Sequence, residues 1–204
     1  METHYVYAAL LGLSLAASTG LNTFLPLLML AGAARFHLMG FDAGQALNGN
    51  FAWVASNPAL IALSMATAVE VVGDKIPAID HALDVFGTVA RPVVGSFAAA
   101  SVFTGADPAM AALAGLAIGA PTALGFHAAK AGTRAASSAT TLGLGNPVLS
   151  TLEDIAAVGM TLIGLTFPWL VPVVLVAAIF VMWRVFKKVR GQWPFNKRRS
   201  VPTV

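Results

Sequence analysis

The sequence predicts an all-α fold, a polytopic transmembrane bundle of about six spans. Of its 204 residues, 57% are hydrophobic and only 10% are charged, whereas a soluble domain carries about 25% charged residues. Several apolar segments are long enough to cross roughly 30 Å of hydrocarbon. In addition, seven of the twelve Lys and Arg residues lie at or after Arg184, as expected of a basic tail beside anionic lipid.

The N-terminal apolar block, residues 5–34, contains a small and polar patch. Ser18, Thr19, Gly20, Asn22 and Thr23 interrupt the block, which predicts a helix interruption near the middle of the membrane. The block lacks the Lys or Arg of a signal-peptide n-region, and its apolar run continues to residue 30. We therefore expect a retained first membrane helix rather than a cleaved signal.

The remaining spans are predicted from helix-start signals. Asn57-Pro58, Asp107-Pro108 and Asn146-Pro147 each place a capping residue before a proline, and the segments that they start end near residues 72, 129 and 165. Residues 79–90 are amphipathic, which favours an interfacial or re-entrant piece. Residues 92–103 are apolar but short, and they span the membrane only if they borrow residues from before Arg91. Residues 132–145 are rich in Ser, Thr and Gly and predict a connection, and residues 168–186 predict the last span.

The positions of the bases predict that both termini are cytoplasmic. With six spans, the connections near Lys75 and Lys130 also fall inside, and only Arg35 falls outside. We expect one transmembrane domain over residues 1–186 and a basic tail over residues 187–204. Residues 12–21 resemble residues 115–124, which favours two inverted three-helix halves, 1–104 and 105–186, as in secondary transporters. The alternative is chance similarity between Ala- and Gly-rich helices.

Acidic residues close the second apolar block. Glu70 and Asp74 are four residues apart and share a helix face, where two carboxylates repel unless a base or a cation lies between them. Lys75, Arg91 or a bound cation could serve. Glu70 lies deepest in the apolar run and is expected to be buried, whereas His81 and Asp84 are expected to face water.

The second half carries a basic helix face. His127, Lys130 and Arg134 follow one another at i, i+3 and i+7, so they point to the same side of a helix. With the free N–H groups at the helix start of Asn146 and Pro147, they would form a seat for an anion or an acidic head group. Anchoring of a cytoplasmic helix end by ordinary positive-inside bases is the alternative.

Glu153 and Asp154 lie in the second turn after this helix start. There they can stabilise the helix N-terminus through its dipole. They can equally pair with Lys130 or Arg134, which would join the acidic and basic groups into one site.

Several kinds of activity lack their sequence signature. The chain has no cysteine, and its four histidines have no ligand spacing, so no metal site is expected. No nucleophile elbow, Walker loop or dinucleotide fingerprint is present, so we predict no catalytic residue and no cofactor, and an enzyme is the less expected class. No nucleic-acid reader module accompanies the basic tail. Membrane lipids and a small solute or lipid head group are the expected partners, and a homo-oligomer remains open.

Two charged motifs resemble a known family. Glu70-x3-Asp-Lys-x-Pro-x2-Asp80 with Arg91-Pro-x2-Gly95, and Lys130-Ala-Gly-Thr-Arg134 with Ser150-x2-Glu-Asp154, are similar to those of the bacterial membrane proteins called domain of unknown function 4126. Val71 stands where that pattern commonly has an aromatic residue. The resemblance implies a small multi-helix membrane protein of unassigned activity whose charged motifs act together. We expect this protein in the inner membrane. It supports one set of site residues: Glu70, Asp74, Lys75, Arg91, Lys130, Arg134, Glu153 and Asp154, to which the helix start adds Asn146.

The resemblance supplies no substrate, so the function is predicted from the charges alone. Charged residues inside a membrane are costly and therefore usually functional. The preferred expectation is a small transporter or channel-like protein with a charged central site for an anionic solute or a lipid head group. The alternatives are a membrane scaffold that binds lipid without moving it, and an intramembrane lipid-modifying enzyme.

Overall fold

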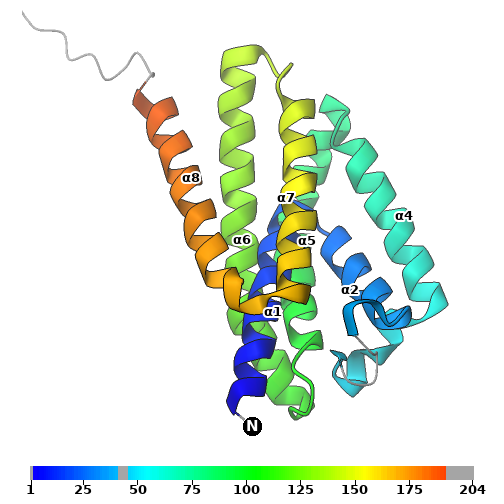
Figure 1. Cartoon of the computed structure of the whole chain (residues 1–204). Coiled ribbons are helices and arrows are strands. Elements are labelled where there is room, and N and C mark those ends of the chain that lie inside the picture. Colours follow the sequence, from blue (N-terminus) through cyan, green and yellow to red (C-terminus); the bar gives the residue numbers. More distant parts are fainter. Residues whose placement is uncertain (1, 41–45, 192–204) are drawn as a thin grey trace, which may run out of the picture.

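The computed structural model describes residues 2–40 and 46–191, and every regular element within them is helical (Figure 1). The all-α prediction is therefore confirmed. The longer elements are α1 (Glu2–Leu21), α2 (Leu25–Arg35), α4 (Asn57–Gly73), α5 (Pro77–Ser101), α6 (Pro108–Thr141), α7 (Asn146–Thr166) and α8 (Val171–Gly191). Short 3-10 helices lie between some of them: η1 (Leu38–Gly40), η2 (Gly49–Ala55) and η3 (Pro168–Leu170).

The first apolar block forms two helices instead of one. α1 ends at Leu21 and α2 begins at Leu25, which confirms the predicted interruption. The Asn22 side chain binds the first residue of the new helix, because its Oδ1 accepts a hydrogen bond from the Leu25 N–H at 3.2 Å. Pro26 fits the first turn of α2, where a backbone N–H would have no helical partner.

α2 folds back along α1. Leu27 and Leu30 of α2 share an apolar cluster with Leu15 of α1. At the far end of α2, Arg35 donates from Nε to the Asn57 Oδ1 at 3.3 Å, beside the start of α4. The two helices thus form a hairpin that starts and ends at the same end of the bundle (Figure 1).

α4 leans away from the rest of the bundle (Figure 1). Its start matches the predicted Asn57-Pro58 signal, although the cap is Ser56, whose Oγ accepts from the Ala59 N–H at 3.4 Å. The axis bends by 65° between η2 and α4. Few side chains of α4 are buried, whereas its large apolar side chains are exposed, as in a helix that faces lipid: Ile61, Met65, Val69 and Val72.

Residues 79–90 and the apolar segment after them form one helix. α5 runs from Pro77 to Ser101 and continues through Pro92, so the apolar segment borrows the residues before Arg91, and residues 79–90 do not form a separate piece. Residues 79–90 have the pattern of a surface helix because Asp80, Asp84 and Arg91 lie on one helical face. Their polarity imitates the face of a surface helix, although Asp80 and Arg91 are buried.

α6 starts at Pro108 after the N-cap Asp107, whose Oδ1 accepts from the Ala109 N–H at 2.9 Å, as predicted. It continues to Thr141, so most of the predicted connection over residues 132–145 is helical. Hydroxyl groups there bond back to carbonyls one turn earlier, Thr140 to Ala136 at 2.9 Å and Thr141 to Ser137 at 2.8 Å, and so do not compete with the helix. The 34 residues of α6 span about 51 Å, more than the hydrocarbon thickness.

The last predicted span is divided at its start and extended at its end. η3 covers Pro168–Leu170, and α8 then runs from Val171 to Gly191. The predicted tail boundary at residue 187 therefore lies inside a helix. The part of the predicted tail from residue 192 to residue 204 is outside the described residues.

α1 is the central helix of the bundle. Its Ser14 Oγ donates to the Met160 carbonyl of α7 at 2.6 Å. Along α6, Ala8 clusters with Ala111, and Gly20 lies against Ala123 further along both helices. α1 and α6 therefore run in the same direction, so the aligned residues 12–21 and 115–124 are parallel. The predicted inverted relation between them is not confirmed.

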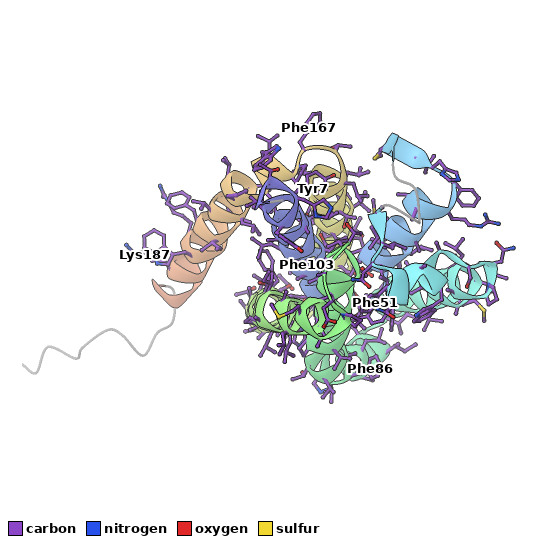
Figure 2. All side chains as sticks on the ribbon, turned by 90° about the horizontal axis from the view of Figure 1, so that it is seen from below. Tyr7, Phe51, Phe86, Phe103, Phe167 and Lys187 are labelled. Carbon is purple, nitrogen blue, oxygen red and sulfur yellow. The ribbon has the colours of Figure 1, made fainter. Side chains whose placement is uncertain are left out.

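Only part of the predicted span count is supported. Within the described residues, α6 and α7 are long and apolar enough to cross a membrane, and the bent pair of η2 and α4 gives a third candidate. Six spans are not confirmed. The start of α1 and the end of α8 lie at opposite ends of the bundle (Figure 1). Figure 2, seen along the bundle, places Lys187 of α8 and Phe86 of α5 at the periphery, with Phe103 near the centre.

Candidate functional site

Glu70 binds the interruption between α1 and α2. The Thr23 N–H donates to both of its carboxylate oxygens at 2.9 Å, and the Thr23 Oγ1 donates to Oε1 at 2.7 Å. The Phe24 N–H adds a longer bond of 3.3 Å to Oε2. Free N–H groups at a helix start favour an anion, so a carboxylate from α4 supplies the partner that the interrupted chain lacks.

Arg91 binds the same interruption from α5. Its side chain is 0% exposed and its Nη2 lies 3.4 Å from Glu70 Oε1. It also donates to the Gly20 carbonyl at 3.2 Å and to Thr23 Oγ1 at 3.3 Å. A further contact joins Arg91 Nη1 to His127 Nδ1 at 2.5 Å. Because arginine has no acceptor, the imidazole nitrogen is the acceptor in this contact.

Lys130 binds the end of α1 from α6. Its Nζ donates to the Leu21 carbonyl at 2.9 Å and to Asp74 Oδ2 at 2.9 Å. Glu153 Oε2 lies 3.4 Å from the same nitrogen. The last carbonyls of α1, which have no partner within their own helix, are thus bound by cationic side chains of α5 and α6.

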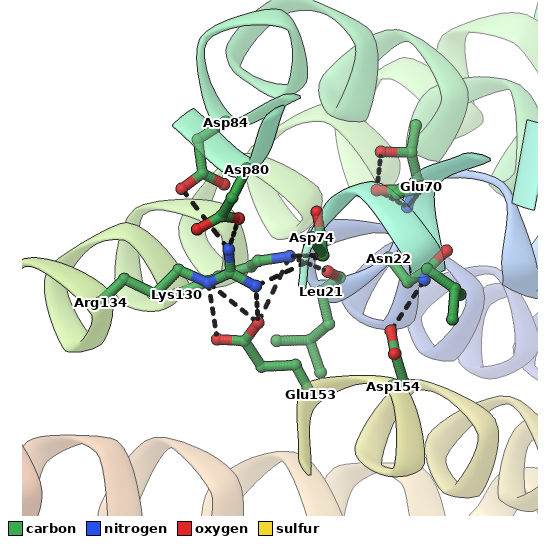
Figure 3. Close-up of polar contacts among 12 residues, drawn as sticks. Leu21, Asn22, Glu70, Asp74, Asp80, Asp84, Lys130, Arg134, Glu153 and Asp154 are labelled. Carbon is green, nitrogen blue, oxygen red and sulfur yellow. Dashed lines mark hydrogen bonds and ion pairs between the residues drawn. The ribbon is translucent and has the colours of Figure 1, made fainter. Parts of the chain in front are cut away.

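Arg134 joins carboxylates from three helices (Figure 3). Its Nη2 donates to Glu153 Oε2 of α7 at 2.7 Å and to Asp74 Oδ2 of α4 at 3.3 Å. Its Nη1 forms an ion pair with Asp80 of α5, and the Asp84 Oδ2 lies 4.0 Å from it. A planar guanidinium can hold several oxygens at once, so Arg134 is the central cation of this group.

Asp154 completes the network from α7. Its Oδ1 accepts from Asn22 Nδ2 at 3.0 Å, and its Oδ2 pairs with Lys75 Nζ at 3.0 Å. The Lys75 side chain is 35% exposed, so the network reaches the protein surface here. Figure 3 shows the contact between Asn22 and Asp154.

The structure brings eight of the nine predicted site residues together: Glu70, Asp74, Lys75, Arg91, Lys130, Arg134, Glu153 and Asp154. Asn146 belongs elsewhere, because its Nδ2 donates to Ser138 Oγ at 3.1 Å near the α6–α7 turn. The amides before Pro147 are also engaged locally: Gly145 donates to Thr141 Oγ1 at 3.1 Å, and Asn146 to the Gly143 carbonyl at 3.1 Å. They do not face Lys130 and Arg134.

Five members of the network were not in the predicted set of site residues. His127 appeared only as part of the basic helix face. Asn22 and Thr23 appeared only as polar interruptions, and Asp80 and Asp84 appeared as flanking charges. The useful signal was the spacing of four and seven residues from Asp80 to Asp84 to Arg91, which places all three on one face of a continuous helix. The expectation that Asp84 faces water fails in part, because its side chain is only 20% exposed. His81 is exposed, as expected.

A cavity lies where α2 ends and α4 begins, away from the charged network. It has a volume of about 380 Å³ and is lined by residues of α2, the following turn, η2 and the start of α4: Ala34, Arg35, His37, Ala52, Ala55, Ser56, Asn57 and Pro58. α2 runs from the charged network at its start to this cavity at its end. Among the described residues, no group of three or more His, Cys, Asp or Glu side chains is arranged to hold a metal ion.

The fold and the site together define a class, an all-helical protein with membrane-spanning candidates and an interrupted helix bound by buried charges. The chain belongs to the family described as Domain of unknown function (DUF4126), whose sequence model matches residues 9–188. This match agrees with the resemblance carried by the two charged motifs. No curated protein and no solved structure matches the chain.

Proposed function

We propose that the protein is a small inner-membrane transporter or channel-like protein whose charged centre is the α1–α2 interruption. The observation that carries this proposal is the binding of one unwound segment by charged side chains of α4, α5, α6 and α7. Interrupted helices inside a membrane are tolerated where protein buries them or water reaches them. Transporters use such interruptions to bind solutes and ions.

α4 is the element that we expect to move. It contributes Glu70 and Asp74 to the network, while its outer apolar side chains are exposed. The cavity at its start and the charged network near its end lie on the same helix. Movement of α4 away from α2 would open a route between them, in the manner of a hinge at the bend between η2 and α4.

The ion pairs of Lys130 and Arg134 limit which charged solute the site can bind. Lys130 and Arg134, which the sequence suggests for an anion, are already paired with Asp74 and Glu153. An anionic solute would have to displace Glu153 from Arg134. We therefore propose that the protein transports a charged solute and that the ion pairs of Lys130 and Arg134 open during transport.

Purified protein in liposomes tests this proposal. Liposomes loaded with a pH-sensitive dye are placed in gradients of Na⁺, K⁺, phosphate or a small carboxylate, and flux is compared for the wild type, Glu70→Gln and the cap-preserving control Asp107→Asn. We expect flux of at least one probe, lost in Glu70→Gln and kept in Asp107→Asn. Flux equal to that of empty liposomes for every probe would count against transport.

The arrangement of the ends leads to a separate topological prediction. We propose that the α1–α2 hairpin enters and leaves from one side, and that α4 to α8 then cross the membrane. With the bases near the end of α8 in the cytoplasm, the N-terminus lies on the opposite side, unlike the six-span prediction.

The chain has no cysteine, so single cysteines at Thr3→Cys and Lys187→Cys can report this topology. An impermeant maleimide should label the first in intact cells whose outer membrane is permeable, and the second only after the inner membrane is opened. Equal protection of both positions would restore the prediction that both termini are cytoplasmic.

The second candidate function is lipid binding without transport, and α8 favours it. Arg184 lies 5.4 Å from the centre of the Phe180 ring, and Lys187 Nζ lies 5.2 Å from that of Trp183. All four side chains are exposed. Basic and aromatic side chains at a helix end suit the membrane interface. If liposome flux is absent while anionic lipid is retained in purification, this scaffold function replaces the transporter.

A further inference from the structure

A single strong base lies in the first part of the chain, at the end of α2. Arg35 is the only Lys or Arg among the first 74 residues, and α2 and α8 end toward opposite ends of the bundle (Figure 1). Asn57 orients the Arg35 side chain, because its Oδ1 accepts a hydrogen bond from Nε at 3.3 Å. That bond does not use Nη1 and Nη2, the two outer nitrogens with which a guanidinium binds an oxyanion as a fork.

The Arg35 guanidinium lines the cavity where α2 ends and α4 begins. The cavity volume of about 380 Å³ lies near the lower end of the roughly 300–1,000 Å³ found for small-molecule sites. Two of its lining residues, Ala34 and Ala55, are buried and apolar. Ser56 and Asn57 contribute a hydroxyl and an amide. The cavity therefore combines an apolar part with a fixed cation and neutral hydrogen-bonding groups.

The charge of this cavity differs from that of the charged network. Lys130 and Arg134 are each bound by carboxylates, whereas no Asp or Glu is among the described residues that line the cavity around Arg35. The first residues of α4 also line the cavity, and the dipole of a helix adds partial positive charge at its start. A cation in such a setting favours an oxyanion as its ligand.

The surroundings of the cavity indicate that the oxyanion belongs to a lipid. Phe36, Leu38 and Met39 follow Arg35 in the chain, and each is more than half exposed. Trp53, which follows the lining residue Ala52, is 60% exposed. Large exposed apolar side chains beside a cation are typical of the membrane interface, where tryptophan lies at the level of the head groups. A ligand with both an oxyanion and an apolar part would contact both kinds of group.

We propose that the cavity between α2 and α4 binds the phosphate group of a membrane phospholipid. Arg35 holds two phosphate oxygens, the Asn57 amide and the Ser56 hydroxyl donate to the others, and the acyl chains lie against the exposed apolar side chains nearby. This site is separate from the charged network and does not depend on transport. Its lining comes from both sides of the 65° bend between η2 and α4, so a bound lipid stabilises that bend.

Thermal unfolding of delipidated full-length protein in an uncharged detergent tests the site. Three probes are compared: phosphatidylglycerol, which has phosphate and acyl chains, diacylglycerol, which lacks the phosphate, and inorganic phosphate, which lacks the acyl chains. Phosphatidylglycerol at ten times its Kd should raise the midpoint by about 3–6 °C, and the other two probes should raise it much less. An equal rise with diacylglycerol would reject a phosphate site. An equal rise with inorganic phosphate at the same concentration would make free phosphate the ligand and overturn the lipid proposal.

Variants assign the rise to the cavity. Arg35→Gln removes the cation, and Ala52→Leu fills the cavity from an exposed position while every charge is kept. Each should remove most of the rise with phosphatidylglycerol. Lys187→Gln, which removes an exposed base of α8, is the matched control and should keep the rise. Because the rise is measured within each variant, a lower midpoint without lipid does not affect the comparison.

Two results would overturn the inference. A rise that persists in Arg35→Gln but is lost in Lys187→Gln would place the lipid at α8. A lower midpoint in Arg35→Gln with an unchanged rise would mean that Arg35 only stabilises the end of α2 through the helix dipole. Arg35→Lys should keep part of the rise, because lysine retains the charge but not the planar fork.

Discussion

Glu70→Gln is expected to destabilise the wild-type protein strongly. The same substitution should have a smaller effect in a chain that already carries Arg91→Met. Arg91 is completely buried, and removal of one partner of a buried ion pair costs about 3–5 kcal/mol. In the double variant no unpaired cation remains, and the glutamine oxygen can still accept from Thr23. The two single effects should therefore sum to more than the effect of the double variant.

Thermal unfolding in detergent, followed by size-exclusion chromatography, measures this cycle. In a chain of this size, 1 kcal/mol corresponds to about 2–4 °C, so Glu70→Gln should lower the midpoint by roughly 10 °C. Asp107→Asn provides a charge-neutralising control, because asparagine is also a good N-cap. Additive effects of Glu70→Gln and Arg91→Met would mean that the two side chains do not act as a pair.

Gly20→Ala is expected to have the second largest effect. A Cβ atom at residue 20 would lie 2.5 Å from the Ala123 carbonyl oxygen and 2.5 Å from Phe126 Cβ. The first of these is backbone and cannot turn away. α1 and α6 would have to separate at the end of α1, where Arg91 binds the Gly20 carbonyl and Lys130 binds the Leu21 carbonyl. Overpacking of this kind costs about 1–3 kcal/mol.

Gly125→Ala is the matched control for this prediction. Gly125 lies in α6 close to the same contact, but a Cβ atom there meets nothing within 4 Å, and alanine is the better helix former. The midpoint should fall in Gly20→Ala and stay level or rise in Gly125→Ala. A similar fall in both variants would show that helix propensity or lipid contacts, and not the α1–α6 approach, decide the result.

The sequence predicts the polar interruption of the first helix and most of the charged network. Both predictions depend on local composition: Asn22 and Thr23 stand out in an apolar block, and Glu70, Lys130 and Arg134 stand out in apolar helices. The cost of placing polar groups there makes such residues informative without any knowledge of the fold. The predicted pairing of Glu70, Glu153 and Asp154 with bases is confirmed, although Asp154 pairs with Lys75.

The wrong predictions arise where tertiary contacts change the meaning of a local pattern. Asp80 and Asp84 made residues 79–90 resemble a surface helix. The sequence does not show that Arg134 lies opposite these two aspartates. The Ser- and Thr-rich end of α6 looked like a connection because its hydroxyls could have competed with the backbone. The direction of α1 relative to α6 depends on α2 folding back along α1. No single segment of the sequence specifies that fold-back.

The interruption after Leu21 also has a consequence for the order of biogenesis. The partners of its polar groups are synthesised much later. Lys130 is 109 residues beyond Leu21, and Asp154 is 132 residues beyond Asn22. Synthesis proceeds from the N-terminus, so the nascent α1–α2 hairpin carries an unsatisfied Leu21 carbonyl until α6 has emerged and an unsatisfied Asn22 side chain until α7 has emerged. A ribosome-bound chain that stops before residue 130 should thus be a preferred substrate for membrane quality control.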